Sequence, residues 1–262
     1  MFTARLAARL LIASSLVDRT YRRFDRLRSE VVASLASDDA LDRFNELAYG
    51  RTPRYQPESG AFQSYLFPFE EGVIDEFFPT PPGRVLLGGA GGGREAFALA
   101  ERGYEVVAFE PAQNLVDQLA GAIGDMAIEV RSGSYEDVER LFPDDTFDAA
   151  IFGWGSFSHL RSEAARLDAL RQYARLTAGP ILVSFLALRS EAGSRLTRLR
   201  RVLPRRRERD PHDVFAMTIG LYHPVDEQEV RLLAERAGLR IVELNFDERE
   251  TSWPHVVLQR AG

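Results

Sequence analysis

A cluster of glycines between an apolar segment and a helical pattern constrains this chain more than any other feature. Residues 84–88 predict a buried strand, residues 93–102 predict a helix, and five glycines stand at the junction, within 88–93. Glycine permits positive φ and lets the backbone approach a ligand, and the start of a helix offers unpaired N–H groups to an anion. A second predicted strand, 105–110, ends on Glu110, which is placed to accept hydrogen bonds from ribose hydroxyls. The pattern predicts a cofactor that carries a nucleoside.

The alternation of strand and helix continues beyond this first unit. Such alternation favours an α/β fold in which helices cover both faces of a parallel sheet. The expected strands are 84–88, 105–110, 127–131, 147–153 and 180–186, and the expected helices are 93–102, 111–122 and 162–177.

The end of the chain predicts a change in strand direction. A helix is expected at 226–237, with Gly238 as its stop, followed by strands at 241–246 and 255–259. The connection between these two strands is too short for a parallel crossover, which needs a dozen or more residues. The sheet is therefore expected to end in an antiparallel hairpin.

The glycine loop alone does not identify the cofactor. Its second half, GGGREA, also fits the dinucleotide pattern G-x-G-x-x-A, and Glu110 lies at a suitable distance along the chain. A nicotinamide enzyme and an S-adenosylmethionine enzyme are both compatible with this loop.

Three motifs in order resemble those of the class I S-adenosylmethionine-dependent methyltransferases. Residues 85–93 resemble the first, glycine-rich motif of that family. Residues 147–160 are similar to its fourth strand, where an Asp opens the strand and a loop with aromatic residues and a histidine follows. Residues 223–239 resemble its penultimate helix and turn. The resemblance covers about 80–188 and 221–260.

The resemblance implies a doubly wound, Rossmann-like sheet, mostly parallel with an antiparallel last strand, together with N-terminal helices and an inserted cap segment. It implies S-adenosyl-L-methionine as the cofactor, with its ribose on Glu110, its methionine portion along the glycine loop, its adenine beside Ser134 and Tyr135, and its sulfonium above 152–154. The residues implied in cofactor binding are Gly89, Ala90, Gly91, Gly93, Arg94, Glu110, Pro111, Ser134, Tyr135, Phe152, Gly153 and Trp154.

Two positions depart from the family pattern. Leu87 stands where the family commonly has an acidic residue, and Ser134 follows Gly133 where the family commonly has Asp. At the second position a hydroxyl would replace the carboxylate that binds the adenine amino group, unless Asp137 takes its place.

Two residues near the loop have alternative interpretations. Arg94, like Glu95, is either a solvent-exposed residue of the first helical turn or, because a guanidinium binds carboxylates in a bidentate manner, the partner of the methionine carboxylate. His159 is the candidate catalytic residue, since an imidazole can take a proton at neutral pH. The alternative is that His159 only orients its loop.

The N-terminal part is expected to form a separate helical and aromatic lid segment, 1–78, ahead of a methyltransferase domain, 79–262. An apolar stripe that includes Val17 predicts a helix packed on its own domain, and the alternatives are contact with a membrane surface and homodimer formation. Its apolar run is far shorter than the ~20 residues that span a bilayer, so a cytoplasmic location is expected. The aromatic residues of 49–69 either wedge these helices onto the sheet or cover a substrate, with Tyr65 as a substrate-binding candidate.

Composition excludes several kinds of chemistry. The chain has no cysteine and no lysine, which excludes thiolate catalysis, disulfides and Schiff-base formation. Eight arginines and one glutamate in 195–209 give a local charge of +7, so the rest of the chain carries −13 within a total of −6. An acidic body with one basic segment does not predict a nucleic-acid surface. No spacing of His, Asp and Glu predicts a metal site.

The arginine-rich segment lies in an expected insertion, about 187–224, where this fold often places substrate-recognition elements. It is either a solvated basic helix or a site that captures an acidic or phosphorylated substrate. Arg205 and Tyr222 are therefore substrate-binding candidates, and His212 and His223 are further residues that could line the cleft.

The sequence thus predicts S-adenosylmethionine-dependent methyl transfer to an oxygen or nitrogen of a small-molecule or saccharide acceptor, which the arginines suggest is anionic. One alternative is a protein of the same fold with a non-methylating or regulatory role. A weaker alternative is an NAD(P)-dependent oxidoreductase.

Overall fold

A computed structural model describes residues 64–188, 210, 212–216, 219–248 and 252–261, together with individual residues between 14 and 47. Its helices are α3 (Pro68–Phe77), α4 (Arg94–Glu101), α5 (Gln113–Ala122), α6 (Val138–Leu141), α7 (Glu163–Leu176) and α9 (Glu227–Arg236). Its strands are β1 (Arg84–Gly88), β2 (Glu105–Glu110), β3 (Ile128–Ser132), β4 (Ala149–Phe152), β5 (Ile181–Ser184), β6 (Val214–Ala216), β7 (Gly220–Tyr222), β8 (Leu239–Asn245) and β9 (His255–Arg260). Two 3-10 helices, η3 (Tyr135–Asp137) and η4 (Ser156–His159), follow β3 and β4.

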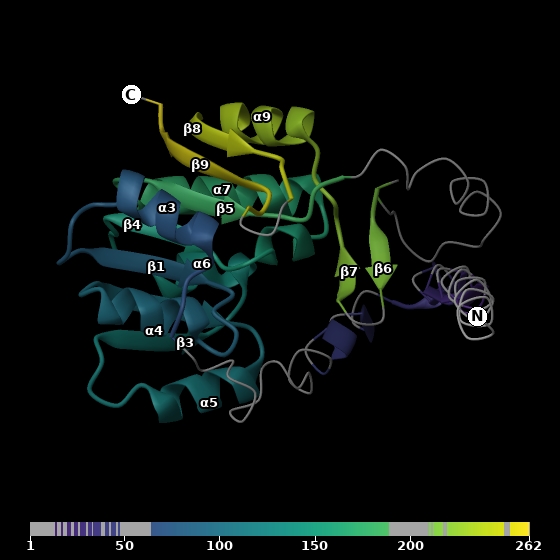
Figure 1. Cartoon of the computed structure of the whole chain (residues 1–262), viewed down its shortest axis with the longest axis horizontal. Helices are drawn as coiled ribbons and strands as arrows, with labels where there is room; N and C mark the ends of the chain where they lie inside the picture. The colour runs from purple at the N-terminus through teal and green to yellow at the C-terminus, as the bar shows by residue number, and fades with distance from the viewer. Residues whose placement is uncertain are drawn as a thin grey trace, which may run out of the picture.

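Seven strands form one sheet in the order β3-β2-β1-β4-β5-β9-β8 (Figure 1). Neighbouring strands from β3 to β5 pair in parallel, whereas β9 is antiparallel to both β5 and β8. The predicted α/β, Rossmann-like fold with a reversed last strand is confirmed. The bounds predicted for β1 and β2 match the structure, and β8 begins two residues earlier than expected, at Leu239, with a register irregularity between Ile241 and Glu243.

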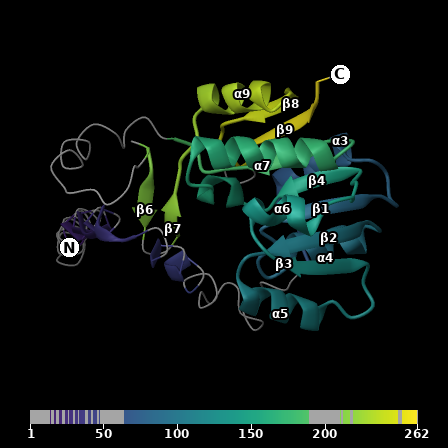
Figure 2. The ribbon, with the colours of Figure 1, turned by 180° about the vertical axis from the view of Figure 1, so that it is seen from behind.

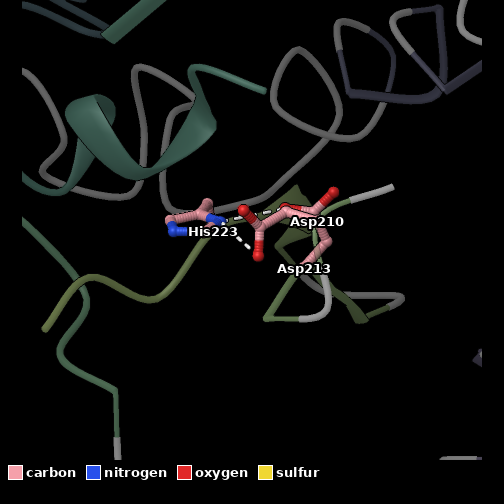
Figure 3. Close-up of side chains that lie close together, drawn as sticks. All are labelled: Asp210, Asp213 and His223. Atoms are coloured by element: carbon pink, nitrogen blue, oxygen red, sulfur yellow. Dashed lines mark hydrogen bonds and ion pairs between the residues drawn. The ribbon is translucent and has the colours of Figure 1, made fainter. Parts of the chain in front are cut away.

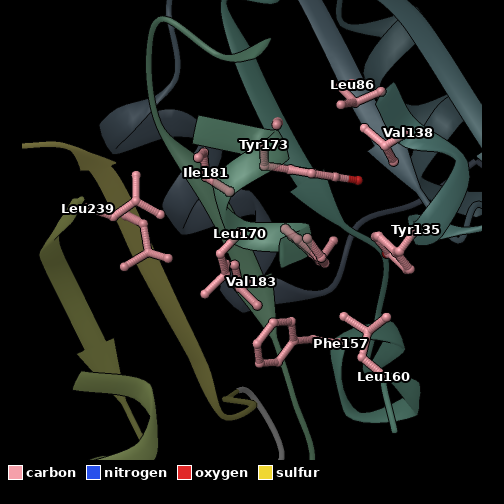
Figure 4. Packing of buried hydrophobic residues seen from close by; sticks show 14 of the residues in the cluster. Leu86, Tyr135, Val138, Phe157, Leu160, Leu170, Tyr173, Ile181, Val183 and Leu239 are labelled. Atoms are coloured by element: carbon pink, nitrogen blue, oxygen red, sulfur yellow. The ribbon is translucent and has the colours of Figure 1, made fainter. Parts of the chain in front are cut away.

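Helices cover both faces of the sheet, as Figures 1 and 2 show from opposite sides. Successive residues of a strand point to opposite faces, so Leu86 of β1 packs in one buried cluster and its neighbours Val85 and Leu87 in the other. The first cluster, part of which is drawn in Figure 4, includes residues of α6, α7 and α9. The second includes residues of α3, α4 and α5. The sheet is therefore doubly wound.

Helix α3 was not predicted, because its sequence belongs partly to the aromatic segment 49–69. It begins with Pro68 at its first position, where a missing N–H costs nothing. The Glu70 side chain accepts a hydrogen bond from the Phe67 N–H (2.7 Å), which satisfies one free donor of the first turn. Val73 and Ile74 then pack under the sheet. Helix α3 is thus part of the packed sheet unit, and the predicted boundary between residues 78 and 79 falls within that unit.

The hairpin β6–β7 lies beside the sheet, next to the N-terminal residues (Figure 1). This hairpin, in the expected insertion, was not predicted either. Phe44 packs on Phe215 of β6 with ring centroids 5.3 Å apart, and Leu41 lies in the same buried cluster. The interpretation of the N-terminal stripe as packed on its own domain is not supported at Val17, which is 67% exposed.

Candidate cofactor and acceptor site

The glycine loop between β1 and α4 takes a backbone that only glycine adopts readily. Gly89, Gly91 and Gly93 have φ of 67°, 55° and 90°, and the left-handed region is costly for residues with a Cβ. A Cβ on Gly93 would also lie 2.4 Å from Leu119 Cδ1. Gly153, just after β4, comes equally close to the loop, since its Cβ would lie 2.6 Å from the Gly89 carbonyl oxygen. These contacts fix the loop at the carboxyl ends of β1 and β4.

Glu110 joins the end of β2 to this loop. Its Oε2 accepts a hydrogen bond from Gly91 N–H (2.9 Å), and its Oε1 accepts one from Ala112 N–H (3.0 Å). Burial raises the pKa of the Glu110 carboxyl, and these two backbone hydrogen bonds act in the opposite direction. A carboxylate oxygen can accept more than one hydrogen bond, so the predicted contacts with ribose hydroxyls fit this geometry. Pro111, which lies between Glu110 and Ala112 in the chain, is exposed.

Arg94 is held by protein carboxylates. Its two terminal nitrogens bind the two oxygens of Glu70 at 2.6 and 2.7 Å, and Nη2 also binds Glu95 Oε1 at 2.6 Å. The guanidinium lies over the Phe67 ring, 4.1 Å from its centroid. Arg94 and Glu95 are 9% and 5% exposed, so their interpretation as solvent-exposed residues is wrong. The contacts favour a structural role for Arg94, and its contact with the methionine carboxylate stays a prediction.

The segment after β3 packs beside the glycine loop. The Tyr135 ring stacks on Phe152 at 4.9 Å, and its hydroxyl bonds Ser156 Oγ at 2.6 Å. Both rings belong to the first buried cluster, in which Figure 4 labels Tyr135, so these side chains support the glycine loop from within the core. The Asp137 carboxylate accepts hydrogen bonds from the N–H (2.9 Å) and hydroxyl (3.1 Å) of Ser134. Ser134 thus caps η3 in a capping box with Asp137, and the adenine contact of Ser134 stays a prediction.

The loop after β4 is bound to strand β7 at its far end. His159 Nδ1 lies 3.0 Å from the Leu221 carbonyl oxygen, and His223 N–H donates to the Ser158 carbonyl oxygen at 2.7 Å. Because a carbonyl oxygen only accepts, Nδ1 carries the proton and the neutral ring has its lone pair on Nε2. Burial lowers the pKa of His159, while the hydrogen bond to Leu221 raises it. The His159 ring is therefore neutral at pH 7.

An aromatic wall, defined here as Phe67, Trp154 and Trp253, stands beside the loop. Trp154 follows β4, and its ring centroid lies 5.1 Å from those of both Phe67 and Trp253. The Trp154 backbone N–H donates to Glu95 Oε1 (3.2 Å), which ties the wall to the Arg94 network. Tyr65 packs edge-on against Phe67 at 5.6 Å and is 44% exposed, at the rim of the wall. The sequence did not predict a role for Trp253, because the connection between β8 and β9, in which it lies, is far along the chain from the other motifs.

A buried charge cluster connects the hairpin to α9. Arg166 of α7, 1% exposed, binds Glu229 Oε1 at 2.7 Å, and Glu229 Oε2 lies 2.9 Å from His223 Nε2. The other ring nitrogen, Nδ1, lies 3.0 Å from Asp213 Oδ1. Burial opposes the charged imidazole, but the hydrogen bonds to Asp213 and Glu229 outweigh it and raise the pKa of His223 to about 9. His223 is thus enclosed by its carboxylate partners.

Some predicted substrate residues are placed differently or not described. Tyr222, on β7, is half-buried. Arg205 and the arginine-rich segment 195–209 lie outside the described residues, as do residues 49–63. Within the described part of the chain, no helix combines the length and apolar character needed to cross a membrane.

Comparison with known proteins identifies the domain. Residues 85–178 match the family model of a methyltransferase domain. Among solved structures, protein PH0226 of Pyrococcus horikoshii shares 18% identity, covering 81% of this chain and 98% of that one, with a TM-score of 0.60. The amino pentose methyltransferase CalS10 of Micromonospora echinaspora shares 16% identity, covering 82% of this chain and 96% of that one, with a TM-score of 0.55. An S-adenosylmethionine-dependent methyltransferase of Methanosarcina mazei shares 14% identity, covering 74% of this chain and 98% of that one, with a TM-score of 0.56. A search of the curated proteins gives no match.

The matched domain, the reversed last strand and the glycine loop with Glu110 define a class I methyltransferase. The protein is an S-adenosylmethionine-dependent methyltransferase, and S-adenosyl-L-methionine is its cofactor. The nicotinamide alternative is therefore set aside.

Proposed function

We propose that the chain transfers a methyl group to an oxygen or nitrogen of a small-molecule or saccharide acceptor. The observation that carries the proposal is the aromatic wall of Phe67, Trp154 and Trp253, next to the glycine loop. Ligands of open α/β sheets bind beyond the carboxyl ends of the strands, so this wall borders the place where an acceptor meets the cofactor. Small-molecule sites are lined mainly by apolar and aromatic side chains, with a few polar groups that orient the ligand.

Trp253 supplies one such polar group. Its Nε1 is buried and has no hydrogen-bond partner among the described residues. A buried donor without a partner costs about 1–3 kcal/mol, and an acceptor hydroxyl or carbonyl oxygen would satisfy it. The structural similarity to an amino pentose methyltransferase supports a saccharide as this acceptor.

The cofactor supplies an electrophilic methyl group bonded to a sulfonium sulfur. Glu110 would hold the ribose through the remaining lone pairs of its carboxylate, and the glycine loop leaves its backbone N–H groups and an open surface for the methionine portion. An acceptor bound against the wall around Trp154 would displace water from the reacting atoms, which favours transfer to a positioned nucleophile.

His159 is the proposed general base. Its Nδ1–H is committed to Leu221, so Nε2 is the atom that would take the proton from the acceptor as the new bond to the methyl carbon forms and the bond from that carbon to sulfur breaks. The β7 strand thus orients the ring through the Leu221 carbonyl.

The arginine-rich segment 195–209 supports an anionic acceptor through its charge of +7. Replacing Arg205, Arg206 and Arg207 with Gln is expected to raise the KM for such an acceptor and leave cofactor affinity unchanged. Equal KM values for the triple variant and the wild type would remove this part of the proposal.

The acceptor class is tested by incubating the purified chain with S-adenosylmethionine and separate pools of sugars, amino sugars, sugar phosphates, peptides and RNA. S-adenosylhomocysteine release is measured, and products are identified by mass spectrometry. We expect turnover with a saccharide or another small molecule, and a higher KM in Trp253→Phe, which keeps an aromatic ring but removes the N–H donor. Methylation confined to the peptide or RNA pools would overturn the proposal.

A further inference from the structure

We infer that Asp210, Asp213 and His223 bind one divalent transition-metal ion. The two carboxylates come from the segment before β6, and the imidazole follows β7. Figure 3 shows the His223 ring with Nδ1 directed at both carboxylates. The two carboxylate oxygens and Nδ1 all lie within 4.8 Å of one another. The proposed function gives Asp210, Asp213 and His223 no contact with the cofactor or the acceptor, so the inference does not depend on it.

The spacing of the donor atoms suits a shared ion. Two donors bound side by side to one ion, each at about 2.1 Å, lie about 3.0 Å apart. His223 Nδ1 and Asp213 Oδ1 already have this separation, at 3.0 Å. Asp210 Oδ1 lies 3.9 Å from Nδ1, and its side chain, 36% exposed, has room to close the remaining gap. Little rearrangement is therefore needed for three-point binding.

The far side of the His223 ring has the support that a ligating histidine needs. Metal-binding histidines usually donate their other ring N–H to a carboxylate, which fixes the ring and its tautomer. Here Glu229 Oε2 lies 2.9 Å from Nε2, and Arg166 holds the other Glu229 oxygen at 2.7 Å. This chain of contacts directs Nδ1 toward the aspartates. When the ion binds, the Nδ1 proton leaves to solvent and a metal–nitrogen bond replaces the contact with Asp213.

The local backbone keeps both carboxylates together. Asp213 N–H donates to the Asp210 carbonyl oxygen (3.1 Å), and His212 N–H donates to Asp210 Oδ1 (2.9 Å). One imidazole nitrogen with two carboxylate oxygens favours ions such as Mn²⁺, Co²⁺ or Zn²⁺ over Ca²⁺ and Mg²⁺, which prefer oxygen donors alone. Three protein ligands also leave coordination positions for water or another oxygen.

The ion would link the two strands of the hairpin at their open end. Asp213 directly precedes β6 and His223 directly follows β7. A bound ion is therefore expected to raise the unfolding temperature of the chain, because it binds the native hairpin and not the unfolded chain.

The test uses the full chain, first dialysed against a chelator. Zn²⁺ and Mn²⁺ are titrated by calorimetry, and Co²⁺ is followed by its visible absorption. We expect one ion per chain and at least about tenfold weaker binding in Asp210→Asn, which loses one ligand charge. Asp125→Asn, which removes an exposed carboxylate elsewhere, is the matched control and should bind like the wild type.

His223→Gln should abolish binding, but it also removes buried contacts. If His223→Gln does not fold, the Asp210→Asn variant decides whether the ion binds here, because it leaves the contacts of His223 with Asp213 and Glu229 in place. Absence of stoichiometric binding to the wild type would overturn the inference. Equal affinities in Asp210→Asn and Asp125→Asn would overturn it as well, because the bound ion would then lie elsewhere.

Discussion

Replacing Arg94 with Met removes a guanidinium that contacts two buried carboxylates. The side chains of Arg94, Glu70 and Glu95 are 11%, 3% and 7% exposed, and the bonds to them are 2.6–2.7 Å long. Removing one member of a buried ion pair leaves an uncompensated charge and costs about 3–5 kcal/mol. Since domains are stable by about 5–15 kcal/mol, we expect Arg94→Met to lose a large part of the free energy of unfolding at about pH 8.

The cost should depend on pH. Burial raises the pKa of Glu70 from 4.5 to about 7; hydrogen bonds from Arg94 lower it, and the charge of Glu95 raises it. Without Arg94 the Glu70 pKa rises further. A carboxyl whose pKa is higher in the folded state contributes stability that is full below pH 4.5 and is lost as pH rises through the folded-state pKa. The penalty of Arg94→Met should therefore be smaller at about pH 5.5 than at about pH 8.

Urea unfolding of wild type and variant at both pH values measures these penalties. Arg102→Met is the matched control, because Arg102 also links α4 to α3, through Asp75 at 2.7 Å, but in an exposed pair expected to contribute about 0–1 kcal/mol. A penalty for Arg94→Met no larger than that of Arg102→Met, or one that does not change with pH, would refute the reasoning. A stable variant that no longer binds S-adenosylmethionine would instead assign Arg94 to the methionine carboxylate.

Three further outcomes follow from the site. Glu110→Gln should weaken S-adenosylmethionine binding by about 1–3 kcal/mol, the scale for hydrogen bonds to a charged group; unchanged affinity in calorimetry would remove Glu110 from the ribose role. His159→Ala should lower kcat by about 10²–10⁴ with little change in cofactor affinity; a loss of kcat smaller than about threefold would leave His159 only a positioning role. The wild-type kcat should fall on acidification with a midpoint below pH 6.5, because burial lowers the pKa of the His159 base. Gly93→Ala should destabilise the fold by about 1–3 kcal/mol, because φ is 90° and Leu119 lies 2.4 Å from the new Cβ; thermal unfolding identical to the wild type would contradict this.

The sequence predicts best those parts of the molecule whose signals are local. The bounds of β1 and β2 follow from apolar runs that end on a glycine or on Glu110, and the reversed β9 follows from a connection too short for a crossover. Helix α3 was missed because it begins at Pro68, directly after an aromatic segment, and this stretch shows no clear helical periodicity.

Contacts between distant residues could not be predicted from the sequence. The partner of Arg94, Glu70, lies in the helix that was missed, so no pattern could indicate that the guanidinium is buried. His223 meets Asp213 across the open end of the β6–β7 hairpin, which was not predicted, and it meets Glu229 in the first turn of α9. The spacing of these residues along the chain resembles no common metal motif, which is why no metal site was expected.

The most direct test of this account is calorimetric titration of the purified chain with S-adenosylmethionine, S-adenosylhomocysteine, NAD and NADP. The account predicts that the first two bind at one per chain, that they compete with each other, and that Glu110→Gln weakens both. Tight binding of NAD or NADP without binding of S-adenosylmethionine would contradict the assignment of the glycine loop and Glu110 to a methyltransferase cofactor site.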